Sequence, residues 1–367
     1  MLYEIAVTLA APFIALGMIF SKRGRERLLQ RFGFINAAGD FWAHGASVGE
    51  VKGLNPILNR LTETPFITSI SPTAKASALL PFDSRVFLKP IFNQIKPKAL
   101  IISESDIWPV LINEAFKRDI PIFYVNTRVT ESGFNRIKKS NLLKKSLHNV
   151  KFFFCEDINT ENRLKLLGFN NVSVEGNAKY ELIADSNPKS LEFLKQADSP
   201  FITLASIHPG EERVLFPVLK EILSDKILVV APRHKERIKY FEDILRKEFK
   251  GVTKFSEGKW GKILLIDTFG DLGIFLENSF LAVICGSFIP GIGGHNPLEG
   301  KKVPTVIGPY HEKVSSLVLP DWVGADKIKK AVQDASFREK IKLELSSVYE
   351  SQKGVGERVA NKIIEMI

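Results

Sequence analysis

Cysteine is scarce in this sequence, which has two in 367 residues. Cys155 and Cys285 lie far apart and each ends an apolar run, so we expect both in the interior. This argues against a disulfide framework, and a reducing compartment fits. The cysteines and histidines also lack the close spacing that is typical of a metal site.

Low-complexity segments are absent as well. The 45% hydrophobic and 25% charged residues are typical of a globular protein, and the length allows about two domains. The net charge of +10 favours a polyanionic partner: nucleic acid, anionic lipid or a phosphorylated substrate. An ordinary basic protein is the alternative. We expect no nucleic-acid partner, because the sequence lacks a nucleic-acid motif and interleaved aromatic residues.

The N-terminus lacks two features of a cleaved signal peptide, a positive segment before the apolar run and a small-residue cleavage site after it. From Ile5 to Phe20 the chain is apolar apart from Thr8, and as a helix the first twenty residues would span roughly 30 Å. Positive residues follow directly: Lys22, Arg23, Arg25, Arg27 and Arg31. We therefore predict an uncleaved membrane anchor over residues 1–21, with the rest in the cytoplasm. Glu4 and Pro12 weaken this prediction, and a helix lying at the membrane interface is the alternative.

From residue 40 onward, short apolar strands alternate with helical stretches. Strands are expected near 41–44, 65–70, 98–103, 120–125, 150–155, 201–205, 226–231, 263–266 and 281–285. The segment 172–179 closes the first half, and the segment 303–309 follows the glycine-rich stretch described below. This alternation predicts an α/β protein with two doubly wound domains facing each other across a cleft. The predicted domains are 22–185 and 201–367, joined by a polar linker over 186–200. The last helix can pack back on the first domain.

A glycine-rich stretch, Gly286–Glu299, follows the predicted strand 281–285. We expect a helix to begin there, with Asn296 as the N-cap, Pro297 as the first helical residue and Glu299 closing a capping box. Glycines before a helix N-terminus let the backbone approach a ligand, and the free amides favour an anion such as a phosphate. An ordinary strand-to-helix turn is the alternative.

The loop after the first strand carries a second candidate. Ser47 and Glu50 have capping-box spacing, so Glu50 can be no more than the acid that closes a helix start. Alternatively, a carboxylate at the mouth of a strand-to-helix loop, beside His44, can act as a general base. The residues alone leave both interpretations open.

Polar residues end several other predicted strands. Glu104 and Asp106 precede Trp108-Pro109, which suggests that they line a site. The alternative is an ordinary helix N-terminus with acidic residues in its first turn, which would have the same sequence pattern. Arg233 ends another strand and suits a phosphate ester, because arginine binds oxyanions through two parallel hydrogen bonds. Five of the six histidines lie at strand or helix edges, which favours a site: His44, His208, His234, His295 and His311.

Taken in order, these motifs resemble the Kdo (3-deoxy-D-manno-octulosonic acid) transferases of lipopolysaccharide assembly. The matching segments are His44–Glu50, Glu104–Pro109, Asn126–Arg128, Gly176–Lys179, Ser206–Glu212, Pro232–His234 and Gly293–Glu299. The resemblance implies a GT-B glycosyltransferase with two Rossmann-like domains, N-terminal for the acceptor and C-terminal for the donor, anchored at the cytoplasmic face of the inner membrane. Its implied partners are CMP-Kdo and a lipid A precursor (lipid IVA). The positive charge of the chain favours anionic lipids of the inner membrane as a further partner. Transfer would proceed with inversion, without a metal or another cofactor.

The resemblance also implies residue roles. Glu50 is the implied general base, and Glu104 and Lys179 are implied to support the transition state. Contacts with CMP are implied for Ser206, His208, Pro232, Arg233, His234, Phe269, Gly270, Asp271, Asn296, Pro297, Leu298 and Glu299. Contacts with the acceptor are implied for His44, Ser47 and Arg128. Because Glu299 would repel a phosphate, we expect it either to accept hydrogen bonds from ribose or to close its own helix cap.

Two rival functions share some of these features. Another GT-B enzyme that uses a UDP-sugar would also have a glycine loop followed by an acid. A non-catalytic membrane-anchored protein that binds anionic lipid would account for the positive charge and the apolar N-terminus.

Overall fold

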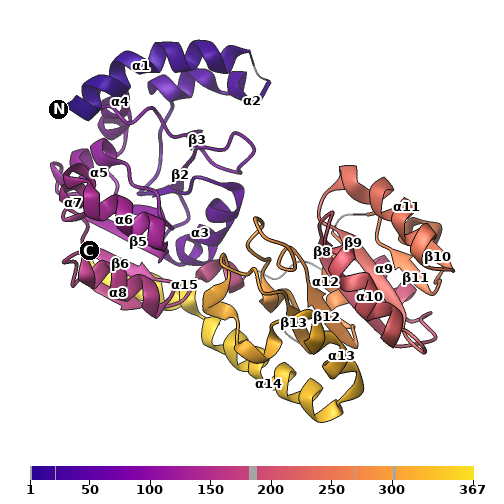
Figure 1. The fold of residues 1–367 in the computed structure, drawn as a ribbon. Coiled ribbons are helices and arrows are strands. Elements are labelled where there is room, and N and C mark those ends of the chain that lie inside the picture. Colours follow the sequence, from indigo (N-terminus) through magenta and orange to yellow (C-terminus); the bar gives the residue numbers. More distant parts are fainter. Residues whose placement is uncertain (1, 21, 182–187, 269, 301–302) are drawn as a thin grey trace. The chain divides into compact units, whose positions relative to one another are not determined.

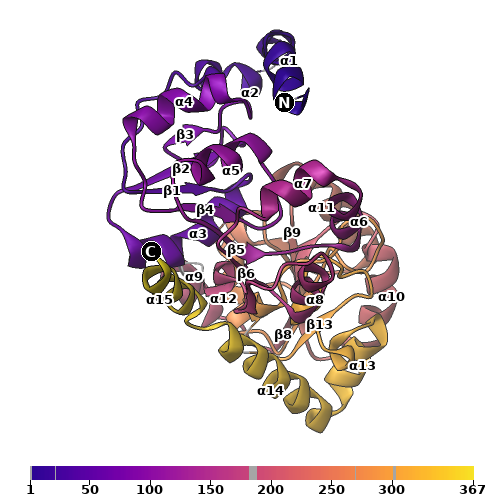
Figure 2. The ribbon, with the colours of Figure 1, turned by 90° about the vertical axis from the view of Figure 1, so that its left-hand side faces the viewer.

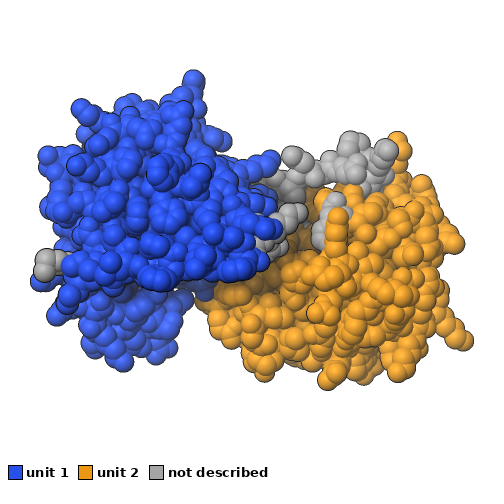
Figure 3. All heavy atoms as spheres, turned by 90° about the horizontal axis from the view of Figure 1, so that it is seen from above, with its two compact units in different colours: residues 1–182, 352–367 blue, residues 183–351 orange. Residues whose placement is uncertain are grey.

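The computed structural model describes residues 2–20, 22–181, 188–268, 270–300 and 303–367. The chain forms two compact units (Figures 1 and 3). Unit 1 comprises Met1–Leu182 and Gln352–Ile367, and unit 2 comprises Ile183–Ser351. Each unit is built on one parallel sheet, so the predicted α/β class with two Rossmann-like domains is confirmed.

The unit 1 sheet has seven strands in the order β3-β2-β1-β4-β5-β6-β7. Their bounds are β1 Phe41–His44, β2 Pro65–Ser69, β3 Ala78–Leu79, β4 Leu100–Ser103, β5 Ile122–Thr127, β6 Phe152–Cys155 and β7 Val172–Val174. The central strands are buried on both faces, which explains their continuous apolar runs. Cys155 ends β6 in this interior, as predicted.

Helices cover both faces of this sheet. The unit 1 helices are α1 Leu2–Ile19, α2 Lys22–Arg25, α3 Val48–Leu61, α4 Arg85–Gln94, α5 Pro109–Phe116, α6 Glu131–Lys139, α7 Asn141–Leu147, α8 Ile158–Leu166 and α15 Val355–Met366. One face packs on α4 to α8. The other packs on α3 and α15, which contact each other directly. The last helix of the chain therefore completes the core of unit 1.

The unit 2 sheet has six strands in the order β10-β11-β9-β8-β12-β13. They are β8 Phe201–Ile207, β9 Ile227–Pro232, β10 Val252–Lys254, β11 Ile263–Leu265, β12 Leu281–Ile284 and β13 Thr305–Ile307. The helices are α9 Pro188–Leu194, α10 Glu212–Ile222, α11 Ile238–Glu248, α12 Leu272–Glu277, α13 Ala325–Gln333 and α14 Ala335–Gln352. Helix α9 lies in the segment 186–200, and its Phe193 stacks on Trp260 with ring centroids 4.9 Å apart.

Both sheets reverse their strand order near the middle. In unit 1 the chain adds strands outward from β1 on one side and from β4 on the other; in unit 2 the corresponding pair is β8 and β12. Ligands of doubly wound sheets bind at the carboxyl ends of such a strand pair. The loops after β1, β4, β8 and β12 are therefore the places to look for sites.

Helix α1 is apolar and mostly exposed. It is long and apolar enough to cross a membrane, with a mean hydropathy of 1.9 and only 11% of its residues buried. It lies at the opposite end of unit 1 from α15 (Figures 1 and 2). These properties are compatible with the predicted membrane anchor.

Candidate active site

Three residues other than glycine have left-handed backbone conformations at the carboxyl ends of strands. Glu104 (φ 60°) follows β4, Asn126 (φ 51°) lies near the end of β5, and Ser206 (φ 58°) near the end of β8. The register of β5 against β6, and of β8 against β9, shifts at the same places. Each such conformation costs roughly 1 kcal/mol or more, and such strain clusters at functional sites. Backbone geometry thus independently marks loops that the motifs indicated.

Glu50 takes part in the start of α3. Ser47 is the N-cap and accepts a hydrogen bond from the Glu50 amide (3.2 Å), while Glu50 Oε2 accepts one from the Ala46 amide (2.9 Å). Burial raises the pKa of the Glu50 carboxyl; the Ala46 amide opposes this shift, and the charges of Glu104 and Asp106 add to it. A raised pKa suits a general base. The Glu50 side chain can therefore make the capping contact and also act as a general base.

Glu104 and Lys179 form an ion pair beside this carboxylate. Lys179 Nζ lies 3.2 Å from Glu104 Oε1, and both side chains are about one quarter exposed (27% and 22%). Lys179 belongs to the short 3₁₀ helix η2, Ala178–Glu181. Burial raises the pKa of Asp106, opposed by the charge of Arg136 and increased by Glu104. Acids thus gather at the β1–β4 reversal, with Lys179 among them.

A buried amide network holds η2 in place. Asn126 accepts a hydrogen bond from the Ala178 amide (2.8 Å) and donates one to the Gly53 carbonyl (3.2 Å). A Cβ on Gly53 would stand 3.0 Å from Lys179 Cβ, so a side chain at this position would require Lys179 or α3 to shift slightly. The motifs included Asn126, but the assigned site residues did not. Its left-handed conformation, which asparagine tolerates better than most residues, is the signal that identifies it.

A second hydrogen-bonded pair, Asn177 and Glu156, lies close to Lys179. Asn177 donates to Glu156 Oε2 (2.7 Å), and both residues are buried. Burial raises the pKa of Glu156, whereas the charges of Lys179 and Arg128 lower it. Glu156 therefore adds a further carboxylate near Lys179 that the motifs did not identify, because a single acid after a strand has no distinguishing spacing.

The three residues predicted to contact the acceptor have different surroundings. His44 is fully buried; its Nδ1 lies 3.1 Å from Thr68 Oγ1, and its ring meets Trp108 edge-on at 5.6 Å. Burial lowers the pKa of His44 to about 3, so its ring is neutral. Ser47 is exposed at the start of α3. Arg128 lines a pocket of about 320 Å³ with Ser105, Thr130, Ser132, Gly133 and Arg136.

In unit 2, the carboxylate of Glu211 joins the two central loops. It is fully buried and accepts hydrogen bonds from the amides of His208 (2.9 Å), Ser287 (3.0 Å) and Phe288 (3.0 Å). The loop after β8 is therefore tied to the glycine loop after β12. Glu211 belongs to a quoted motif but was not assigned to the site. Helix α10 begins at Glu212, directly after this residue.

Three histidines gather beside these loops. His208 Nε2 lies 2.9 Å from His295 Nε2 with the rings stacked, and His234 meets the His208 ring edge-on at 5.4 Å. Burial lowers the pKa of His208 to about 4 and of His295 to about 3, with further lowering by Arg233 and Lys313. Both rings are thus neutral at pH 7, within a field of positive charge that favours an anion.

Gly286 makes this arrangement possible. It has φ +76°, and a Cβ there would lie 2.6 Å from the His295 ring. The predicted α-helix after the loop is wrong: Pro297–Gly300 forms a four-residue 3₁₀ helix, η5. Asn296 caps it by accepting a hydrogen bond from the Leu298 amide (3.0 Å). Helix η5 packs against β13 and α12.

The remaining donor residues lie in these loops or near them. Pro232 ends β9, while Arg233 and His234 are exposed directly after it. Glu299 is solvent-accessible, yet surrounding protein raises the pKa of its carboxyl against the charge of Arg233. Asp271 is buried and accepts a hydrogen bond from Thr268 (2.5 Å), which indicates a structural contact. Gly270 precedes it, and Phe269 lies outside the described residues.

The neutral histidines predict a pH-dependent stability. The unfolded chain binds a proton at each near pH 6.5, whereas folded His208 and His295 do so only near pH 4 and 3. We therefore expect the free energy of unfolding to fall as pH drops from 6.5 to 4.5, by at most about 1.4 kcal/mol per pH unit for His295 and less for the partly exposed His208. Denaturant titrations at pH 7.5 and 5 measure this. A variant with both residues changed to Gln serves as control, and an equal pH effect in it would contradict the assignment.

Two parallel α/β units with polar residues at both strand-order reversals define a class of protein by its fold, the GT-B-like proteins. The solved UDP-GlcNAc 2-epimerase from Neisseria meningitidis, bound to UDP-GlcNAc, is similar over 89% of this chain and 99% of its own, with a TM-score of 0.55. At 13% identity, this likeness concerns the fold alone.

Sequence comparisons give the family. Residues 26–182 match the family described as 3-deoxy-D-manno-octulosonic-acid transferase (kdotransferase). The enzyme of that name from Aquifex aeolicus is 31% identical over 80% of this chain and 82% of its own length. The one from Haemophilus influenzae is 29% identical over 81% and 78%. The chain belongs to the Kdo transferase family, as the motifs indicated, and is a glycosyltransferase.

Proposed function

We propose that this Kdo transferase moves Kdo from CMP-Kdo, bound by unit 2, to a lipid A precursor (lipid IVA), bound by unit 1. The main support is the division of charge between the two strand-order reversals. Unit 1 has carboxyls with raised pKa values, whereas unit 2 has Arg233 and Lys313 beside neutral histidines. A base that activates an acceptor hydroxyl suits the first environment, and a nucleotide phosphate suits the second.

In the proposed reaction, Glu50 removes the proton of an acceptor hydroxyl. The resulting oxygen attacks the anomeric carbon of Kdo from the face opposite CMP. The bond from that carbon to the phosphate oxygen breaks, CMP leaves as a phosphate monoester, and the configuration inverts. Arg233 and Lys313 offset the charge that develops on the phosphate, so the proposed mechanism requires no divalent ion.

We place this reaction at the cytoplasmic face of the inner membrane, where anionic lipids would attract the basic chain. Helix α1 supports membrane attachment through its apolar, exposed surface. The acceptor is itself a lipid, so attachment would bring the enzyme and its substrate to the same surface.

Mass spectrometry of the product tests the reaction. The full chain would be incubated with CMP-Kdo and lipid IVA, and in parallel with UDP-sugars. We expect a product heavier by one or more Kdo residues only with CMP-Kdo. Transfer from a UDP-sugar would favour the rival GT-B enzyme, and binding of lipid without any transfer would favour the non-catalytic rival.

The Glu104–Lys179 ion pair gives a further prediction. We expect Lys179→Met and Glu104→Gln each to lower kcat by roughly 10²-fold, and the double variant by little more than the poorer single variant, because the pair acts as a unit. Lys98→Met is the matched control, since Lys98 forms an ion pair with Asp40 at 3.3 Å on the surface. Multiplicative losses in the double variant, or normal kcat in either single variant, would contradict a joint role.

A further inference from the structure

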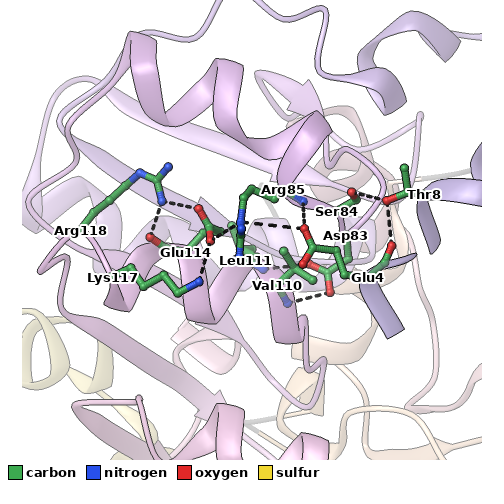
Figure 4. A network of polar contacts seen from close by, with 10 residues as sticks. All are labelled: Glu4, Thr8, Asp83, Ser84, Arg85, Val110, Leu111, Glu114, Lys117 and Arg118. Carbon is green, nitrogen blue, oxygen red and sulfur yellow. Dashed lines mark hydrogen bonds and ion pairs between the residues drawn. The ribbon is translucent and has the colours of Figure 1, made fainter. Parts of the chain in front are cut away.

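One face of α1 is fixed to unit 1 by hydrogen bonds (Figure 4). Thr8 donates its hydroxyl hydrogen to the Glu4 carbonyl (2.7 Å), so the hydroxyl of Ser84, 2.6 Å away, donates to Thr8. The Glu4 carboxylate accepts a hydrogen bond from the Arg85 amide (3.2 Å). The first two turns of α1 are therefore tied to the start of α4.

A second contact joins α1 to α5. Tyr3 donates to Asp83 Oδ2 (3.0 Å), and the same carboxylate accepts the amides of Val110 (3.0 Å) and Leu111 (2.9 Å) at the start of α5. Asp83 is only 3% exposed. Hydrogen bonds to a buried charged group are among the stronger ones, commonly about 1.5–3 kcal/mol. This network favours a docked α1.

The residues of α1 divide into two faces at helical spacing. Ala11 and Ala15 are buried on the side that carries Glu4 and Thr8. Large apolar side chains are exposed on the opposite side: Leu2 (82%), Ile5 (47%), Leu9 (67%), Phe13 (77%), Leu16 (57%) and Phe20 (84%). Their spacing of three or four residues forms one continuous stripe, which is named here the outer stripe. Such a stripe in water marks an interaction surface.

The docked face is incompatible with a membrane crossing by α1. If Tyr3, Glu4 and Thr8 keep their contacts, about eleven residues remain to Ile19, and at 1.5 Å per residue they span roughly 16 Å. The hydrocarbon core of a bilayer is about 30 Å thick. A crossing would therefore require the whole helix to leave unit 1 and the polar network to break.

We propose that α1 lies in the plane of the membrane, with its docked face bound to unit 1 and its outer stripe inserted into one leaflet at the headgroup–acyl boundary. Amphipathic helices of this kind bury an apolar face by about 5–10 Å. Arg25 is exposed at the end of α2, the short helix that follows α1, and the net charge of +10 favours an anionic lipid surface. The proposal concerns membrane topology and does not depend on the transfer reaction.

A disulfide lock distinguishes the two topologies. The neighbouring hydroxyls of Thr8 and Ser84 allow Thr8→Cys and Ser84→Cys to be joined, and the native Cys155 and Cys285 are buried. The full-length double variant would be floated with vesicles of phosphatidylethanolamine and phosphatidylglycerol, oxidised and reduced, without sugar donor. We expect equal binding within twofold. A tenfold loss on oxidation, reversed by reductant, would overturn the proposal.

Depth measurements provide a second test that does not require the lock. An environment-sensitive fluorophore would be attached to single cysteines at Leu2, Leu9 or Phe20, and quenched by lipids that carry a nitroxide at a shallow or a deep position. We expect the three sites to be quenched alike, and more by the shallow probe. Stronger deep quenching at Leu9 than at both ends would indicate a crossing and overturn the proposal.

Substitutions test the outer stripe itself. Leu9→Asp with Phe13→Asp is expected to reduce vesicle binding at least tenfold without lowering thermal stability, because both side chains are exposed. Leu166→Asp with Leu343→Asp is the matched control, since these residues are 77% and 61% exposed on α8 and α14. Unchanged binding of the outer-stripe variant, or an equal loss in the control, would contradict the proposal.

Discussion

Replacing Glu50 by Gln is expected to lower kcat by roughly 10²- to 10⁴-fold, the usual contribution of a general base, while the fold is retained. Glutamine keeps the oxygen that accepts the Ala46 amide, so the start of α3 stays capped. The substitution therefore separates the two roles that Ser47–Glu50 spacing allows. Single-turnover transfer from CMP-Kdo measures the chemical step, and urea unfolding measures stability.

The pH profile sharpens this prediction. Because burial and neighbouring acids raise the pKa of Glu50, wild-type activity should increase with pH as this carboxyl loses its proton. The Gln variant should lack that increase. Glu161→Gln, a change in the first turn of α8, is the control and should keep normal activity. Normal kcat with an unaltered pH profile in Glu50→Gln would leave Glu50 with the capping role alone.

Much of the fold could be predicted because its central strands are buried on both faces. Continuous apolar runs such as Phe41–His44 and Leu281–Ile284 become β1 and β12 almost residue for residue. Strands β3 and β10 were missed, since they have two and three residues at the sheet edges and pair on one side only. The α-helix after Asn296 was predicted from its cap residues, but the described residues Pro297–Gly300 form a 3₁₀ helix that packs against β13 and α12.

The candidate site was predicted less completely than the fold. The motifs lie in the loops at both strand-order reversals, yet the sequence could not tell which of their polar side chains face inward. His44, expected to contact the acceptor, is fully buried against Trp108. Asn126, Glu156 and Asn177 hold the surroundings of Lys179, and their partners are far away in sequence. Such long-range pairs have no local spacing from which they can be recognised.

Glu211 is another residue whose long-range contacts could not be recognised from the local sequence. Its replacement is the second change for which we expect a large effect, here on stability. We expect Glu211→Ala to lower the free energy of unfolding by about 3–5 kcal/mol, because two buried amides and one partly buried amide lose their acceptor and each such loss costs about 1–3 kcal/mol. The free amides belong to His208, Ser287 and Phe288. Folded domains are commonly stable by about 5–15 kcal/mol, so unit 2 would be severely weakened. Urea unfolding measures the loss.

Hydrogen exchange locates the same effect. The amides of Ser287 and Phe288 should exchange much faster in Glu211→Ala, while those of the unit 1 strands should not change. Glu221→Ala is the matched control, because Glu221 lies on α10 and pairs with Lys329 at 2.8 Å between two exposed side chains; its expected cost is under about 1 kcal/mol. If Glu211→Ala were no more costly than this control, Glu211 could not be what joins the β8 loop to the glycine loop, and another contact would have to hold Gly286 against His295.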